Sequence, residues 1–188
     1  MKEYEKKALI TQEEYDVLTD LYKGMSVESQ INSYFDTNDY EMNRRGITCR
    51  IRSKNGKHKT TIKKHSPDRL GCSVEEDLGE GEEFDCRVFE VLGLHLQGKL
   101  ITKRMLIIKD AFCEVVIDRN EYLGYTDYEI EAEYISGYEN RAEKYLESVA
   151  EHLVSAKLID SAENFLLRVG KGKSKSQRFF NRKRYERR

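Results

Sequence analysis

Residues 3–7 read EYEKK, so Glu3, Glu5 and Lys7 occupy every second position. Side chains two residues apart share one face of a β-strand. Two carboxylates followed by an ammonium suit a polar surface better than an apolar core. The same alternation recurs in residues 127–133 (DYEIEAE), where the intervening tyrosine, isoleucine and alanine form an opposite, apolar face. These two stretches predict strands with one acidic face each.

Basic residues alternate along the strands between them. Residues 47–52 (ITCRIR) place Arg50 and Arg52 on one face. Asn55-Gly56 predicts a two-residue type I′ turn, which sets position 50 opposite 61 and Arg52 opposite Lys59. Like charges directly opposite each other cost ~0.2–1 kcal/mol unless solvent or an anion relieves the repulsion. Solvent is the simpler interpretation, and a bound polyanion is the more specific one.

Helical patterns separate the strand patterns. Thr11 and Glu14 have the spacing of a capping box, as do Ser136 and Glu139. Residues 80–92 and about 162–169 also have helical spacing of apolar residues, whereas residues 43–46 read as a loop. About eight strands, mostly hairpin-linked, have one apolar and one charged face. This pattern predicts an α+β, mainly β fold: a closed eight-stranded antiparallel barrel with a charged interior and helices packed on the outside.

Length and charge favour one domain with a basic end. The chain has 188 residues, and we assign 1–180 to a single domain and 181–188 to a C-terminal tail. Residues 171–188 hold nine lysines or arginines and one acid, a net +8, which leaves −9 on the rest of a chain of net charge −1. Residues 182–188 are interpreted as a disordered solubilising end, with a nucleic-acid patch as the alternative.

Other features exclude some function classes. The four cysteines lack paired metal-ligand spacing, which favours reduced thiols and a cytoplasmic location. No apolar run has the length of a membrane span or a signal peptide core, so we expect no membrane association. We expect no nucleic-acid partner, and a monomer or homodimer.

The charged faces together suggest a chemistry. Carboxylates are hard oxygen ligands suited to Mg²⁺ or Mn²⁺, and the candidates here are Glu3, Glu5, Glu129 and Glu131. Guanidinium and ammonium groups bind phosphate oxygens, and the candidates are Arg50, Arg52, Lys63 and Arg104. A metal beside a basic clamp is the equipment of phosphoryl transfer. Glu114 and Asp118 fit either the lining or ordinary hairpin charges. Tyr34 fits either a core aromatic, which we favour, or a hydroxyl in the tunnel.

The order of these motifs resembles the CYTH domain superfamily, also called triphosphate tunnel metalloenzymes, and is most similar to its members from Firmicutes. The resemblance extends from Glu3 to about Phe179. The family's Glu-x-Glu-x-Lys signature matches residues 3–7. Similar landmarks follow at residues 34–37 (YFDT), 50–52 (RIR), 61–63 (TIK), 102–104 (TKR) and 129–131 (EIE).

The resemblance implies a tunnel that binds a triphosphate and one or two divalent metals. It implies that the four glutamates are metal ligands and that Lys7 joins the phosphate-binding residues. The family also has a lysine near the C-terminus at the tunnel mouth. Lys175 is the best match, and Lys171 and Lys173 share its parity. Lys7 and Lys175 are candidates for assisting proton transfer.

The favoured function is therefore that of an enzyme, a metal-dependent triphosphate phosphohydrolase (an acid anhydride hydrolase) that acts most plausibly on inorganic tripolyphosphate. An adenylate cyclase or a thiamine triphosphatase on the same scaffold is the first alternative. A non-catalytic module that binds polyphosphate or nucleic acid is the second. The complete acidic set argues against that module, because binding an anion does not require a metal site.

Overall fold

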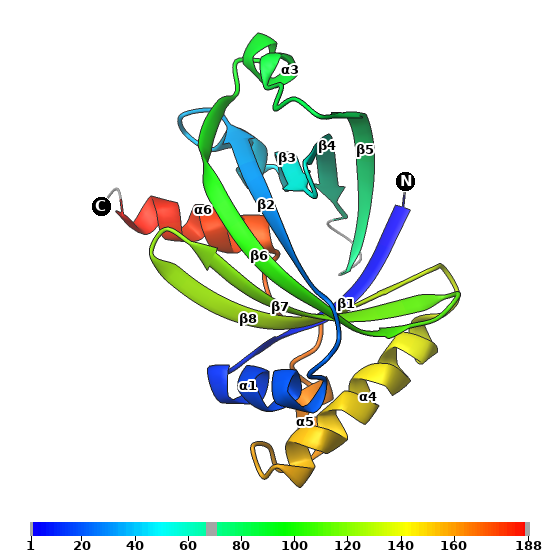
Figure 1. The fold of residues 1–188 in the computed structure, drawn as a ribbon. Helices are drawn as coiled ribbons and strands as arrows, with labels where there is room; N and C mark the ends of the chain where they lie inside the picture. The colour runs from blue at the N-terminus through cyan, green and yellow to red at the C-terminus, as the bar shows by residue number, and fades with distance from the viewer. Residues whose placement is uncertain (1, 67–70, 187–188) are drawn as a thin grey trace.

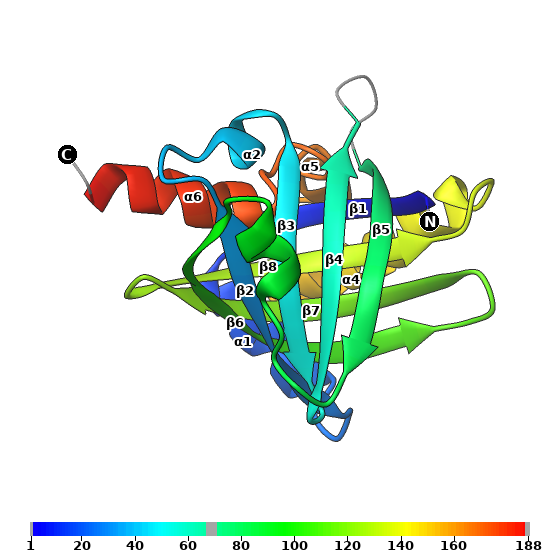
Figure 2. The same ribbon diagram turned by 90° about the horizontal axis from the view of Figure 1, so that it is seen from above.

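The computed structural model describes residues 2–66 and 71–186, in which eight strands close into a barrel (Figure 1). Their order around the barrel is β1-β5-β4-β3-β2-β6-β7-β8, and neighbouring strands are antiparallel. Figure 2 shows β3, β4 and β5 side by side. The predicted fold class is confirmed. The strands are β1 (Lys2–Ile10), β2 (Val27–Asp36), β3 (Ile47–Lys54), β4 (Lys57–His65), β5 (Cys72–Gly81), β6 (His95–Lys109), β7 (Cys113–Tyr122) and β8 (Tyr125–Tyr134).

The helices lie outside the barrel. Figure 1 shows α1, α4 and α5 beneath β7 and β8, α3 at the opposite end, and α6 alongside the barrel. None of the helices in the described residues is both long and apolar enough to cross a membrane. The helices are α1 (Gln12–Leu21), α2 (Glu41–Arg44), α3 (Arg87–Val91), α4 (Glu139–Ser155), α5 (Ala162–Leu166) and α6 (Lys175–Glu186).

The main core lies between the outer face of the barrel and helices α1, α4 and α5. Ile117 and Ile130 point outward from β7 and β8 and are fully buried against Leu146 and Leu153 of α4 and Leu18 of α1. Each such side chain contributes about 1.5–3 kcal/mol through its burial. The apolar faces of the strands therefore hold the helices, which leaves the charged faces to line the interior.

A second core fixes α6 against the barrel. Phe179 and Phe180 are buried against Tyr34 of β2, and Phe179 also contacts Tyr122 of β7. Gly98 of β6 makes room for this packing, because a Cβ at this position would lie 2.8 Å from Phe179 Cζ. Tyr34 thus combines both expected positions, because it packs in this core and also lines the interior cavity of the barrel.

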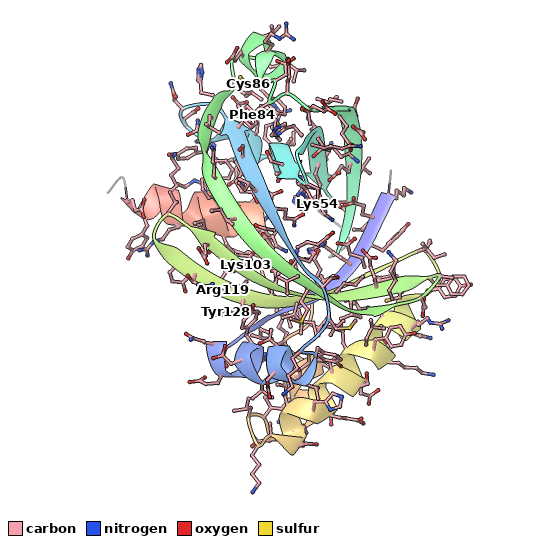
Figure 3. The ribbon with its side chains drawn as sticks, viewed as in Figure 1. Lys54, Phe84, Cys86, Lys103, Arg119 and Tyr128 are labelled. Atoms are coloured by element: carbon pink, nitrogen blue, oxygen red, sulfur yellow. The ribbon has the colours of Figure 1, made fainter. Side chains whose placement is uncertain are left out.

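Residues of β6, β7 and β8 alternate between the outer surface of the barrel and its interior. Lys103, Arg119 and Tyr128 are register partners in a row across these strands (Figure 3). Tyr128 packs on Tyr15 of α1, with ring centroids 4.7 Å apart. Their chain neighbours on the same strands face the interior.

Two local predictions around α3 and α2 were wrong. The helix expected over residues 80–92 is confined to α3, because β5 continues to Gly81 and Glu80 pairs with Lys59 in the β4–β5 ladder. Cross-strand bonding overrides the local helical spacing there. The loop expected at residues 43–46 overlaps the short helix α2, whose Met42 and Asn43 amides donate to the Asp36 carboxylate.

The capping predictions had different outcomes. The capping box of Thr11 and Glu14 is confirmed at the start of α1. The box expected from Ser136 and Glu139 is wrong, because α4 begins at Glu139 with Tyr138 as its N-cap and no side-chain cap bond.

The basic C-terminal segment also differs from its interpretation as a disordered end. As far as Glu186 it belongs to α6, which crosses the expected boundary between residues 180 and 181. The two buried phenylalanines of the second core explain why this charged segment folds.

Candidate active site: a charged barrel interior

The barrel encloses a cavity of about 470 Å³ with a mainly charged lining. Lys54, labelled in Figure 3, is 41% exposed and lies where the cavity meets solvent. The strands contribute alternate residues, as the pleat requires, except at Lys109, which follows the bulge in β6 between Leu106 and Ile108. The charged residues of the lining are Glu3, Glu5, Lys7, Glu28, Arg50, Arg52, Lys54, Lys63, Arg104, Lys109, Glu114, Glu131, Glu133 and Lys175.

Three buried carboxylates gather on β7 and β8. Asp118 pairs directly with Glu129, and Glu131 is the next inward residue of β8. One oxygen of each lies within 4.8 Å of the others, and the three side chains are at most 6% exposed. Hard carboxylate oxygens at this spacing suit a divalent ion such as Mg²⁺ or Mn²⁺. This acidic cluster (Asp118, Glu129 and Glu131) thus fits a metal site.

Cations from α6 and β6 balance the acidic cluster. Lys175 Nζ lies 2.9 Å from Asp118 Oδ2 and 2.7 Å from Glu131 Oε2, and it also contacts Glu129 Oε1. Arg104 donates two hydrogen bonds to Asp118, at 2.9 and 2.7 Å. The cluster is therefore held by internal cations.

The pKa values follow from these contacts. Burial opposes ionisation of Glu129, but the charges of Lys175 and Arg178 outweigh burial and lower its pKa to about 2. Burial likewise opposes the charge on Lys175, yet Asp118 and Glu129 raise its pKa above the ordinary value. Arg178 Nη1 lies 2.8 Å from Glu129 Oε2, and its guanidinium also binds Asp127. The N-terminal turn of α6 is thereby tied to β8 by charge.

The carboxylates of β1 lie against lysines. Glu3 accepts from Lys63 at 2.8 Å, and Glu5 lies 2.6 Å from Lys7 and 3.8 Å from Lys63. Burial raises the pKa of Glu3, but the charge and hydrogen bond of Lys63 have the opposite effect and contribute to a net lowering of the pKa. Burial disfavours charge on Lys7, while Glu5 and Glu131 raise its pKa overall. Lys7 is thus a cation in this arrangement.

Two arginines of β3 have unequal surroundings. Arg50 pairs with Glu75 at 2.7 Å. Arg52 Nε donates to Asn32 Oδ1 at 3.0 Å, and within the described residues Arg52 forms no ion pair. Burial, followed by repulsion from Arg50 and Arg104, lowers the Arg52 pKa to about 10. Among the described residues, Arg52 is thus a desolvated guanidinium without an ion pair, and the charge of Glu75 offsets the lowering of its pKa only in part.

The structure brings most of the predicted site residues to one cavity. The lining includes Glu3, Glu5 and Glu131 and the six predicted phosphate-binding residues. Glu129 is not among the lining residues and is in contact with Lys175. Lys171 and Lys173 are not among the lining residues, so the fold selects Lys175. Glu3 and Glu5 stand apart from the acidic cluster, which has Asp118 as its third member.

Sequence reasoning left some residues unassigned. Asp118 was assigned either to the lining of the tunnel or to the ordinary charges of a hairpin. Its position opposite Arg104 in the β6–β7 hairpin could have identified it as a lining residue. The local sequence around Glu75 did not assign it a role. Its ion pair with Arg50 depends on the register of β4 with β5. Asp127 and Arg178 went unnoticed, and only the parity of Asp127 with Glu129 pointed to the interior.

Comparisons with known proteins agree with this geometry. The sequence profile of the CYTH domain matches residues 1–158. A search of curated proteins finds no match.

Solved structures share the fold at low sequence identity. A proposed adenylate cyclase of Bacillus halodurans is 24% identical, with a TM-score of 0.60 over 79% of this chain and 91% of that one. A proposed adenylyl cyclase from Hippeastrum, described as having a dominant triphosphatase activity, is 19% identical, with a TM-score of 0.57 over 80% and 88%. The Mimivirus capping enzyme triphosphatase is 11% identical, with a TM-score of 0.52 over 81% and 90%.

Proposed function

Because this chain belongs to the CYTH domain family, we propose that it is a metal-dependent hydrolase of linear triphosphates, with inorganic tripolyphosphate as its substrate. The triphosphatase activities described for the Hippeastrum and Mimivirus proteins support this reaction class. The alternative, an adenylate cyclase, has its support in the Bacillus halodurans protein.

The proposal depends mainly on one observation, the desolvated guanidinium of Arg52 that forms no ion pair with a described residue. Its guanidinium lines the cavity, its Nε is held by Asn32, and no described acid pairs with it. A desolvated cation without a partner is costly, and a bound anion removes that cost. Guanidinium groups bind phosphate oxygens in a forked geometry. A phosphate is therefore the natural partner for this side chain.

The acidic cluster would hold the metal. A bound Mg²⁺ or Mn²⁺ neutralises charge on the phosphate oxygens and orients them for displacement. Its ligand oxygens would be those that Lys175 contacts now, so ammonium and metal compete for the same lone pairs. When a metal binds, Lys175 would turn from Glu131 to the nearest remaining anion, the phosphate. Glu3 and Glu5 are the further candidate ligands.

The residues of this chain would then act mainly by positioning. The phosphate-binding residues are proposed to fix the chain of three phosphates, and water attacks a terminal phosphorus with the remaining diphosphate as leaving group. Such positioning and charge neutralisation account for most of the catalysis of phosphoryl transfer. The proposed phosphate-binding residues are Lys7, Arg50, Arg52, Lys63, Arg104 and Lys175.

The cavity favours an inorganic substrate over a nucleotide. Among the described lining residues, only Tyr34 and His65 carry rings. Tyr34 is 1% exposed and engaged with Phe179. Burial and the charge of Lys63 lower the His65 pKa to about 4, which leaves the imidazole neutral at pH 7. A nucleobase would find no exposed aromatic platform here, and stacking is a main source of base binding.

The test measures phosphate and cyclic nucleotide release from tripolyphosphate, ATP and thiamine triphosphate, with Mg²⁺, with Mn²⁺ and with chelator. The variants are Glu131→Gln and Glu5→Gln, and Lys103→Gln on the outer surface is the control. We expect metal-dependent release from tripolyphosphate that both site variants reduce at least 100-fold and the control leaves unchanged.

Other outcomes would replace the proposal. Cyclic AMP formed from ATP would identify a cyclase. Tight binding of tripolyphosphate without turnover of any substrate would identify a polyanion-binding module.

A further inference from the structure

A buried amide on β2 has no hydrogen-bond partner. Gln30 is 4% exposed, lines the cavity, and its Nε2 bonds to no described group. Buried polar groups are nearly always paired, because an unpaired donor loses its water without compensation. A native side chain in this state calls for a ligand, a water or an ion at the same place.

The surroundings of Gln30 decide which ligand it would accept. In the sheet, Gln30 pairs with Lys54 of β3 on one side and Thr102 of β6 on the other. The next inward residues of those strands are Arg52 and Arg104. An amide donor among cationic side chains is satisfied by an anionic acceptor, whereas a second cation or donor would leave it unpaired.

The neighbouring amide of β2 has a different task. Asn32 Oδ1 accepts from Arg52 Nε at 3.0 Å, and no described group bonds to the terminal nitrogens of Arg52. Asn32 is fully buried and is not among the lining residues, so it acts through Arg52. Two successive inward residues of β2 thus serve the cavity, one as an acceptor for the cation and one as a donor for its ligand.

We propose that Gln30 is a substrate-binding residue whose side-chain amide turns so that Nε2, which is buried in the free protein, donates to a phosphate oxygen held by Arg52 and Arg104. The inference rests on the proposed function and adds a neutral donor to a site otherwise made of charges. A neutral donor fixes the position of one oxygen without strengthening the net attraction for every anion. Gln30 therefore contributes to the placement of the phosphate chain along the cavity.

The experiment measures binding of tripolyphosphate by calorimetry in the presence of chelator, so that metal chemistry does not enter. Gln30→Leu removes the donor at similar size, and Gln30→Glu replaces it with an acceptor. Ser29→Ala, on the opposite face of the same strand, is the matched control. We expect about 10- to 100-fold weaker binding for Gln30→Leu, a larger loss for Gln30→Glu, and none for the control.

Two further readouts separate binding from a structural role. The thermal midpoint of the free Gln30→Leu protein should equal or exceed that of the wild type, because the variant no longer buries an unpaired donor. In the wild type, the side-chain amide resonances of Gln30 should shift when tripolyphosphate is added. Unchanged affinity of Gln30→Leu, or a static Gln30 resonance at saturation, would overturn the inference. Failure of the wild type to bind tripolyphosphate both with chelator and with Mg²⁺ would instead overturn the proposed function.

Discussion

Replacement of Arg52 by glutamine should lower activity and raise stability at the same time. Arg52 Nε is bound by Asn32, which leaves its terminal nitrogens for the ligand. Two charge-assisted hydrogen bonds to phosphate contribute about 1.5–3 kcal/mol each. Loss of one such clamp typically costs ~3–4 kcal/mol of transition-state stabilisation. We therefore expect kcat/KM for tripolyphosphate to fall about 100- to 1,000-fold.

The expected gain in stability comes from the same desolvated charge. The Arg52 pKa is lowered from 12.5 to about 10, so the fold disfavours the charged form by up to about 3 kcal/mol. Glutamine removes that charge. Each kcal/mol regained raises the thermal midpoint of a chain of this size by about 2–4 °C. The assay pairs steady-state phosphate release with thermal unfolding of the free protein.

A matched arginine provides the control. Arg119 lies on the outer face of β7 (Figure 3) and pairs with Glu121 at 3.0 Å, with 35% of its side chain exposed. Arg119→Gln should change neither activity nor stability by a measurable amount, because exposed ion pairs contribute little. The reasoning would be refuted if Arg52→Gln kept its activity within threefold, or if it unfolded at a lower temperature than the wild type.

Three other perturbations test the surroundings of the site. Gly98→Ala should destabilise the protein by about 1–3 kcal/mol, because the new Cβ would lie 2.8 Å from Phe179 Cζ; an unchanged urea midpoint would contradict this. The folded pKa of Glu129 is about 2 against 4.5 ordinarily, so the stability it contributes is present above pH 4.5 and lost as pH falls toward 2; urea midpoints across this range should decline, and less so in Glu129→Gln. Lys175→Gln should bind Mn²⁺ more tightly by calorimetry, and its rate of tripolyphosphate hydrolysis should fall. The control Lys171→Gln should match the wild type in both assays. Weaker Mn²⁺ binding by Lys175→Gln would show that the lysine supports the metal site.

The alternation of residues predicted which faces of the strands are charged, because a pleated strand turns successive side chains to opposite sides. This local rule predicted Glu3 and Glu5 on β1 and Arg50 and Arg52 on β3. Asn55-Gly56 in turn predicted the pairing of β3 with β4, since a two-residue turn determines the register of its hairpin.

Local rules were less informative where distant segments meet. Glu80 looked helical from its spacing but lies in a strand, because the β4 ladder offers it backbone partners. The basic end of the chain looked disordered from its charge, yet Phe179 and Phe180 fix it as a helix against the barrel.

The sequence by itself thus determined the strand faces, the register of the β3–β4 hairpin and the residue types of the proposed phosphate and metal site. Only the tertiary structure placed Asp118 beside Glu129 and Glu131, selected Lys175 to fill that cluster, and left Arg52 without an ion pair and Gln30 Nε2 without an acceptor among the described residues. Asp118 meets Glu129 through the β7–β8 register, whereas Lys175 reaches Glu131, 44 positions away, only because α6 docks against the barrel. A periodic pattern states which way a side chain points, but not which distant side chain it meets.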